Sequence, residues 1–153
     1  MFSLIITIIS IALVALLALA TLYYGGSAFS QGSAKAAAST VVSQAQQIAG
    51  ANTLFANDNA GTFAATTAAL QTGSYLSTVP TPPAAAATGA WAIAGAAANN
   101  VTLSLNGSGA QSICTAILKN AGLSTTIASG ATAGRQVDCY GASAPYSFQF
   151  SSN

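Results

Sequence analysis

The sequence predicts an α+β fold, and three observations lead to it. The first 24 residues contain no charged or amide side chain, no Pro and no Gly, which indicates an apolar helix. Apolar residues then recur at helical spacing between Ser33 and Phe55, which indicates an amphipathic helix. Two later segments alternate apolar and polar residues, the pattern of half-buried strands. We therefore expect a long N-terminal helix packed against a small antiparallel sheet.

The stretch from Met1 to Tyr24 is long enough to cross a membrane, because a bilayer core takes about 20 helical residues. Its apolar side chains show no preferred face, and the first charged residue is Lys35. A helix that is apolar all round must be buried on every side, in lipid or in a bundle of similar helices. The sequence therefore predicts a segment that needs partners outside its own domain.

Three other interpretations of this stretch stay open. A cleaved secretory signal could end at Ala18-Leu19-Ala20, although the segment lacks a Lys or Arg start and its apolar part exceeds the usual length. A permanent single-span anchor would fit the length, but no nearby Lys or Arg would set its orientation. A buried core helix is disfavoured at this length without a polar stripe.

A glycine pair, Gly25-Gly26, separates the apolar half of the predicted helix from its amphipathic half. Each Gly costs about 1 kcal/mol relative to Ala inside a helix, so the pair would ordinarily stop one. Beyond it, one side of the second half is formed by Ala38, Val41, Ala45, Ile48 and Phe55. The chain thus passes from an apolar helix to a one-sided helix that can cover a sheet.

The globular part is expected to begin where the long helix ends, in the turn-forming run 57–61. A short helix is predicted from Thr62 to Leu70, with Asp58 or Asn59 as its cap. The other predicted elements are an extended link at 78–83, strands at 91–94 and 101–105, a helix at 111–121, and strands at 136–140 and 146–150. Residues 95–100 would join the first two strands as an antiparallel pair, and Gly122 would end the helix.

Cys114 and Cys139 are the only cysteines. In an exported chain such a pair forms a disulfide, whereas in the cytosol it would remain two buried thiols. The apolar N-terminus favours export, and we therefore predict the bond. Two cysteines without His lack the ligands of a structural zinc site, so no metal and no cofactor is expected.

Charged residues make up only 3% of the chain, and His is absent. No ordinary catalytic triad and no close carboxylate pair can be assembled, so we expect no enzyme. Lys35 and Ser39 stand four residues apart, but a solvated helix face explains them better than a catalytic dyad. A formal charge of +1 leaves no basic patch for nucleic acid in a single subunit. Asn100 and Asn106 match the N-glycosylation pattern, which predicts no more than surface modification.

One family resemblance covers nearly the whole chain. It is carried by the start Met-Phe-Ser-Leu-Ile running into an amphipathic half, by Gly73-Ser-Tyr-Leu76 leading to Pro80, by Cys114–Lys119, and by Asp138-Cys-Tyr140 before a final strand. In these features the chain resembles a mature type IV pilin, most closely the type IVb class of toxin-coregulated and bundle-forming pilins. It departs from the family at position 5, where Ile5 stands in place of the usual Glu.

The resemblance implies a type IV pilin fold and a structural role. Residues 1–30 would form the transmembrane and filament-core helix, 31–56 its amphipathic half, and 57–153 the globular domain. The subunit would be inserted in the inner membrane before assembly and would contact the pilus assembly machinery there. It would then join copies of itself in a helical extracellular filament. The filament-core residues would be Phe2, Leu4, Ile5, Ile8, Ile9, Leu13, Leu16 and Leu17.

Two further expectations concern the assembled helix and the use of the filament. In the assembled state the helix should break at Gly25 and Gly26, into an extended stretch that reaches toward Ser33, because the glycines and serines of this stretch are weak helix formers. The filament would serve adhesion, aggregation, motility or DNA uptake. The alternatives are an exported binding domain with a single membrane span, or a minor pilin or pseudopilin that forms no long filament.

Overall fold

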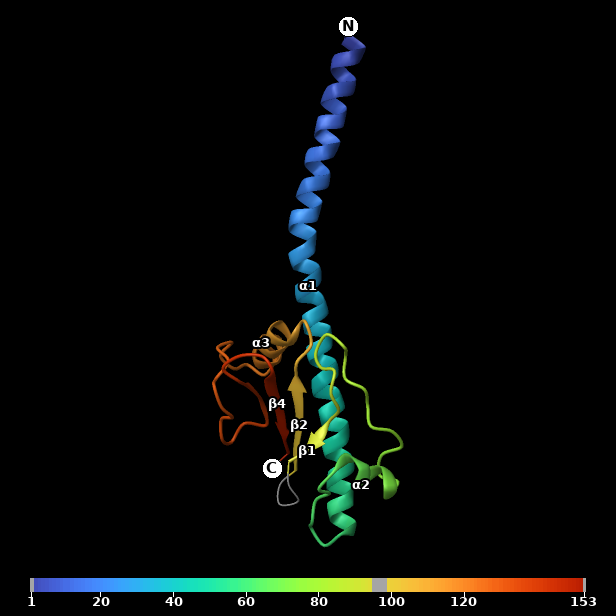
Figure 1. Ribbon diagram of the computed structural model, residues 1–153, viewed down its shortest axis with the longest axis vertical. Helices are drawn as coiled ribbons and strands as arrows, with labels where there is room; N and C mark the ends of the chain where they lie inside the picture. Colours follow the sequence, from blue (N-terminus) through green and yellow to red (C-terminus); the bar gives the residue numbers. More distant parts are fainter. Residues whose placement is uncertain (1, 95–98, 153) are drawn as a thin grey trace. The chain divides into compact units, whose positions relative to one another are not determined.

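The chain folds as an α+β protein, as the sequence predicts, in a computed structural model that describes residues 2–94 and 99–152 (Figure 1). It divides into two compact units, Met1–Ser33 and Ala34–Asn153. The elements are helices α1 (Phe2–Asp58), α2 (Thr67–Thr72) and α3 (Ala110–Asn120), and strands β1 (Ala92–Ile93), β2 (Asn100–Leu105), β3 (Val137–Tyr140) and β4 (Tyr146–Ser151).

Helix α1 ends at Asp58, inside the turn-forming run predicted to stop it. Gly25 and Gly26 are helical, so the single chain has no interruption at the glycine pair. A cost of about 1 kcal/mol per Gly does not stop a helix with good helix formers on both sides. The expected break concerns the assembled state, for which it stays a prediction.

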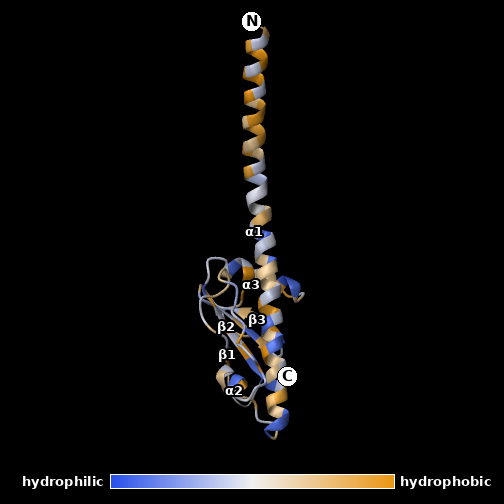
Figure 2. Ribbon diagram, turned by 90° about the vertical axis from the view of Figure 1, so that its right-hand side faces the viewer, coloured by the Kyte–Doolittle hydropathy of each residue, from blue (hydrophilic) through white to orange (hydrophobic). Residues whose placement is uncertain are grey.

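The second unit is built on one face of α1. Ala38, Val41, Ala45 and Ile48 are fully buried, as their spacing predicts. Phe55, the last residue of that stripe, is half-buried and meets the ring of Tyr75 edge-on at 5.4 Å between centroids. Figure 2 shows the change in hydropathy along α1, from mostly hydrophobic residues in its first part to alternating hydrophilic and hydrophobic residues further along. The amphipathic half therefore acts as one layer of the domain core.

The sheet forms the other layer, with four antiparallel strands in the order β1-β2-β4-β3. Its inner rows are set by pairing: Leu103 lies opposite Phe148, which lies opposite Cys139. Phe148 is fully buried and contacts the indole of Trp91 edge-on. Because strand side chains alternate between faces, Thr102, Gln149 and Asp138 form the neighbouring row on the outer face.

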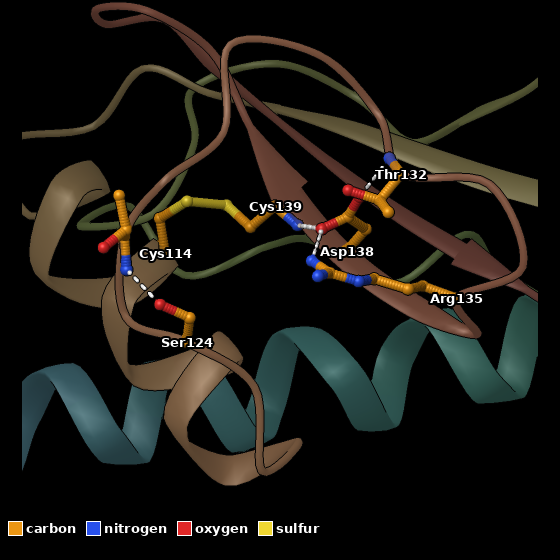
Figure 3. Close-up of polar contacts among 7 residues, drawn as sticks. Cys114, Ser124, Thr132, Arg135, Asp138 and Cys139 are labelled. Carbon is orange, nitrogen blue, oxygen red and sulfur yellow. Dashed lines mark hydrogen bonds and ion pairs between the residues drawn. A yellow bond between two sulfur atoms is a disulfide. The ribbon is translucent and has the colours of Figure 1, made fainter.

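Helix α3 joins the same core through Ile113, Ile117 and Leu118, all buried. Cys114 on α3 and Cys139 on β3 form the predicted disulfide, with Cα atoms 5.7 Å apart (Figure 3). The bond ties helix to sheet across 25 residues of sequence. The loop 121–136 lies between these two elements and contains no helix or strand. The elements that flank it, α3 and β3, are held together by the disulfide as well as by packing.

A buried amide network connects α1 to distant parts of the second unit. Asn52 and Asn99 are both fully buried. The side-chain amide of Asn52 donates to Oδ1 of Asn99 at 2.9 Å, and its own Oδ1 accepts the Ala64 N–H at 2.8 Å. The amide of Asn99 lies 3.0 Å from the Ala49 carbonyl oxygen and 2.6 Å from the Ser152 hydroxyl. Helix, loop and C-terminal strand are thus joined at one point.

Several element boundaries differ from the prediction. Helix α2 begins at Thr67 rather than Thr62, and its cap is the Thr66 hydroxyl, which accepts the Ala69 N–H, and not Asp58 or Asn59. The preceding residues 62–66 are not helical, and among them the Ala64 N–H is bonded to Asn52 on α1.

The strand predicted at 91–94 is only two residues long, and Trp91 serves as a buried core residue beside it. The link predicted at 95–100 falls largely outside the described residues.

Candidate functional site

The first unit exposes large apolar side chains around the whole circumference of α1. Each of these side chains is at least half exposed, from Ile5 at 53% to Phe2 at 84%. All eight expected filament-core positions belong to this set. The exposed members are Phe2, Leu4, Ile5, Ile6, Ile8, Ile9, Ile11, Leu13, Val14, Leu16, Leu17, Leu19, Leu22, Tyr23, Tyr24 and Phe29. We call this set the apolar surface of α1.

Hydroxyl groups within the apolar surface are turned back onto the helix. Thr7 donates to the Leu4 carbonyl oxygen at 2.9 Å, and Ser10 donates to that of Ile6 at 2.8 Å. Thr21 donates to the Ala18 carbonyl oxygen at 2.9 Å. A polar group in an apolar medium is costly unless it is hydrogen-bonded. These three hydroxyls can therefore enter lipid or a helix bundle without leaving a donor unpaired.

Two adjacent tyrosines lie near the C-terminal end of the apolar surface. Tyr23 and Tyr24 meet edge-on with ring centroids 5.6 Å apart. Tyr is enriched where a membrane core meets water, because its ring is apolar and its hydroxyl is polar. The chain therefore contains a segment that is long and apolar enough to anchor in a membrane, by its length and composition.

Sequence reasoning named only half of this surface. Ile6, Ile11, Val14, Leu19 and Leu22 are as exposed as the residues it selected. The signal for them was present, since the helix is apolar on every side and no face could be favoured. The structure places all of these positions on α1.

Asp138 in the second unit is buried, and its carboxylate is surrounded by hydrogen-bond donors (Figure 3). Its Oδ2 accepts the Thr132 N–H at 2.6 Å, and its Oδ1 accepts the N–H of Cys139 at 3.0 Å. Nη1 of Arg135 lies 3.3 Å from the same Oδ1. This ion pair folds the loop at 131–135 over the outer face of β3, a contact that spacing alone did not indicate.

The two glycosylation candidates occupy different environments. Asn100 begins β2 and is half-buried, whereas Asn106 is exposed in the turn after that strand. Oδ1 of Asn106 accepts the Thr88 N–H at 2.8 Å, which fixes the turn against the segment before β1. Gly107 follows because a Cβ there would lie 2.3 Å from the Ala85 carbonyl oxygen. The Ser39 hydroxyl donates to the Ala36 carbonyl oxygen and so is engaged by its own helix.

Comparisons with protein-family models, with curated proteins and with solved structures found no match. The class of protein is therefore defined by the chain's own architecture. A long N-terminal helix with an apolar first half, a small antiparallel sheet and one disulfide are together compatible with a pilin-like fold.

Proposed function

We propose that this chain is a structural subunit of the type IV pilin kind, most like the type IVb class, which polymerises through the apolar surface of α1 into an extracellular filament. The observation that supports the proposal most strongly is the exposure of that surface on all sides. Burying one Leu or Ile side chain is worth about 1.5–3 kcal/mol relative to leaving it in water. So many exposed apolar residues need to be covered, in this proposal by lipid first and by copies of the same helix afterwards.

The second unit has the properties expected of a domain that stays folded outside the filament core. Its own core is complete, with Phe148, Ile48 and Leu103 buried, so it can remain folded at the filament surface. The disulfide suits an exported domain. In this proposal the inner-membrane assembly machinery withdraws subunits from the bilayer, and the mature filament serves adhesion, aggregation, motility or DNA uptake.

Ile5 gives the proposed filament core an unusual property. Residues 1–57 contain no carboxylate side chain, so none is provided by this segment for an ion pair inside the bundle. Association of the helices would then rest on packing and apolar burial, which respond weakly to salt, rather than on ion pairs, which salt screens. An Ile5→Glu variant should not assemble better than the parent.

The decisive experiment is to express the chain with a type IV assembly system and shear the cells. The proposal predicts filaments in the sheared fraction, with this chain as their repeating subunit and α1 in the centre by electron cryomicroscopy. If the chain stays wholly in the inner-membrane fraction while a known pilin is assembled by the same system, the proposal is wrong. The alternative of a single-span anchored domain would then account for the same apolar surface.

A further inference from the structure

A polar pocket of about 410 Å³ lies on the outer face of the sheet, under the loop that carries Arg135. Its polar walls come from two strands and that loop: Asn100 at the start of β2, Gln149 and Ser151 on β4, and Thr132 and Arg135. Its volume falls in the usual range for small-ligand sites, about 300–1,000 Å³. The pocket lies wholly within the second unit and shares no residue with the apolar surface of α1.

The positive charge of Arg135 at the pocket is balanced by the neighbouring carboxylate of Asp138. The carboxylate of Asp138 is 3% exposed and receives two backbone N–H groups in addition to the Arg135 guanidinium. The Arg135 side chain is 34% exposed and lines the pocket. A guanidinium has five N–H donors, and the pair with Asp138 uses one of them. The pocket therefore offers hydrogen-bond donors with little net charge.

Asn100 contributes a hydrogen-bond acceptor to the pocket, whereas Arg135 contributes donors. Among the described residues, its Oδ1 atom is buried and has no hydrogen-bond partner. A buried acceptor left without a partner costs about 1–3 kcal/mol. Asn100 lines the pocket, so a turn of its side chain would bring this oxygen to a donor of the ligand, while an acceptor of the ligand could lie near Arg135.

We propose that this pocket binds a neutral, hydroxyl-rich ligand, such as one sugar unit of a glycan. A hydroxyl group both donates and accepts, so neighbouring hydroxyls can serve Asn100 and Arg135 together. The nearby carboxylate of Asp138, 3.3 Å from Nη1 of Arg135, would disfavour an anion, and the guanidinium itself would repel a cation. A purely apolar ligand would leave the Asn100 oxygen unpaired.

The composition of the lining also sets the strength of binding. Its described residues include no aromatic ring on which a sugar could stack, so one pocket should bind weakly, with a Kd in the millimolar range. Repetition along a filament would raise the overall avidity, because each further contact is made at high effective concentration. This second step rests on the proposed function, whereas binding by the single subunit does not.

The test uses the full chain, isotope-labelled and held in detergent micelles, titrated with glucose, galactose and N-acetylglucosamine. At least one sugar should produce saturable shifts in the side-chain amide signals of Asn100 and Gln149 and in the Arg135 Nε–H signal. The variant Asn100→Leu should weaken binding at least tenfold. The matched control Ser104→Ala, on the outer face of the same strand but outside the pocket, should bind like the parent.

Gln149→Ala provides a second variant that keeps the test valid if Asn100→Leu fails to fold. Absence of saturable shifts with all three sugars would overturn the proposal. An equal or stronger response to acetate or phosphate would overturn it in favour of an anion site, and unchanged binding by both variants would place the sugar elsewhere. Because these measurements need no filament, their outcome is independent of whether the chain polymerises.

Discussion

The two units of the chain use the same residue types in opposite ways. In residues 34–153, Ile48 is fully buried and forms part of a closed core, whereas in residues 2–33 Ile9 is 54% exposed. The first unit contains no charged residue, and the second contains all five of the chain. The difference shows that one unit completes its fold by itself, while the other becomes complete only in a medium or with partners that cover its apolar surface.

The largest effect is expected from a charge placed in the apolar surface. Ile9→Asp should abolish membrane retention and assembly, because Asp near the centre of a membrane helix costs about 3 kcal/mol in every subunit. Membrane fractionation and filament yield measure the loss. The matched control Gln47→Asp puts the same charge on the exposed side of α1 in the second unit and should be tolerated. If both variants were retained in the membrane and assembled to the same extent, the proposed difference between the two units would be wrong.

The disulfide should matter only to the second unit. Replacing both Cys114 and Cys139 by Ser should lower the free energy of unfolding by about 3–4 kcal/mol, because a closed loop of 25 residues restricts the unfolded chain. Denaturant titration of the full chain in micelles measures the change. Membrane insertion of α1 should be unaffected. A stability within 1 kcal/mol of the parent, on the order of measurement error for such titrations, would contradict the prediction.

The buried amides supply the next effect. Asn52→Leu should destabilise the second unit by about 2–3 kcal/mol, since it leaves the Ala64 N–H and the Asn99 oxygen without a partner. Thermal unfolding followed by circular dichroism measures it. Thr53→Ala is the matched control, because its hydroxyl also reaches Asn99 but Thr53 is exposed. If the control costs as much as Asn52→Leu, the network is not held by buried amides.

The glycine pair tests whether the first unit must change shape in a filament. Nothing lies within 4 Å of a Cβ added at Gly25 or Gly26, so the double Ala variant is free of steric conflict. It should stabilise the continuous helix by about 2 kcal/mol. Assembly should become slower or stop if the helix has to open there. Filaments of normal yield, with an unbroken helix by electron cryomicroscopy, would show that the break is not required.

The smallest effect is a dependence on pH at the end of α1. The hydrogen bond from the Tyr75 hydroxyl to Asp58, 2.6 Å long, raises the pKa of Tyr75 above its ordinary value. A raised pKa means that the stabilisation is fully present below about pH 10 and is lost as pH rises through the folded pKa. Thermal midpoints of the parent and of Tyr75→Phe should therefore differ by a constant amount below pH 10. Above it the difference should shrink, and a difference that grows instead would contradict the sign.

Periodicity in the sequence was sufficient for the main elements. The stripe from Ala38 to Ile48 predicts the face that α1 buries, and alternation in 101–105 and 146–150 predicts β2 and β4. The apolar surface was also predictable, because a helix that is apolar on every side shows in composition alone. These features are local, and each depends on residues within a few turns or strand positions of one another.

What only the tertiary structure decided involves residues far apart in the chain. The Ala64 N–H reaches Asn52 on α1, and Asn100, Gln149 and Arg135 meet across two strands and a loop to line the polar pocket. No spacing rule connects such positions, because strand order and loop placement are set by the packing of the whole core. The sequence by itself therefore determined which segments are helix, strand or apolar surface. The folded domain determined which polar groups are satisfied and which buried ones are left without a partner among the described residues, namely Oε1 of Gln44, Nε1 of Trp91 and Oδ1 of Asn100.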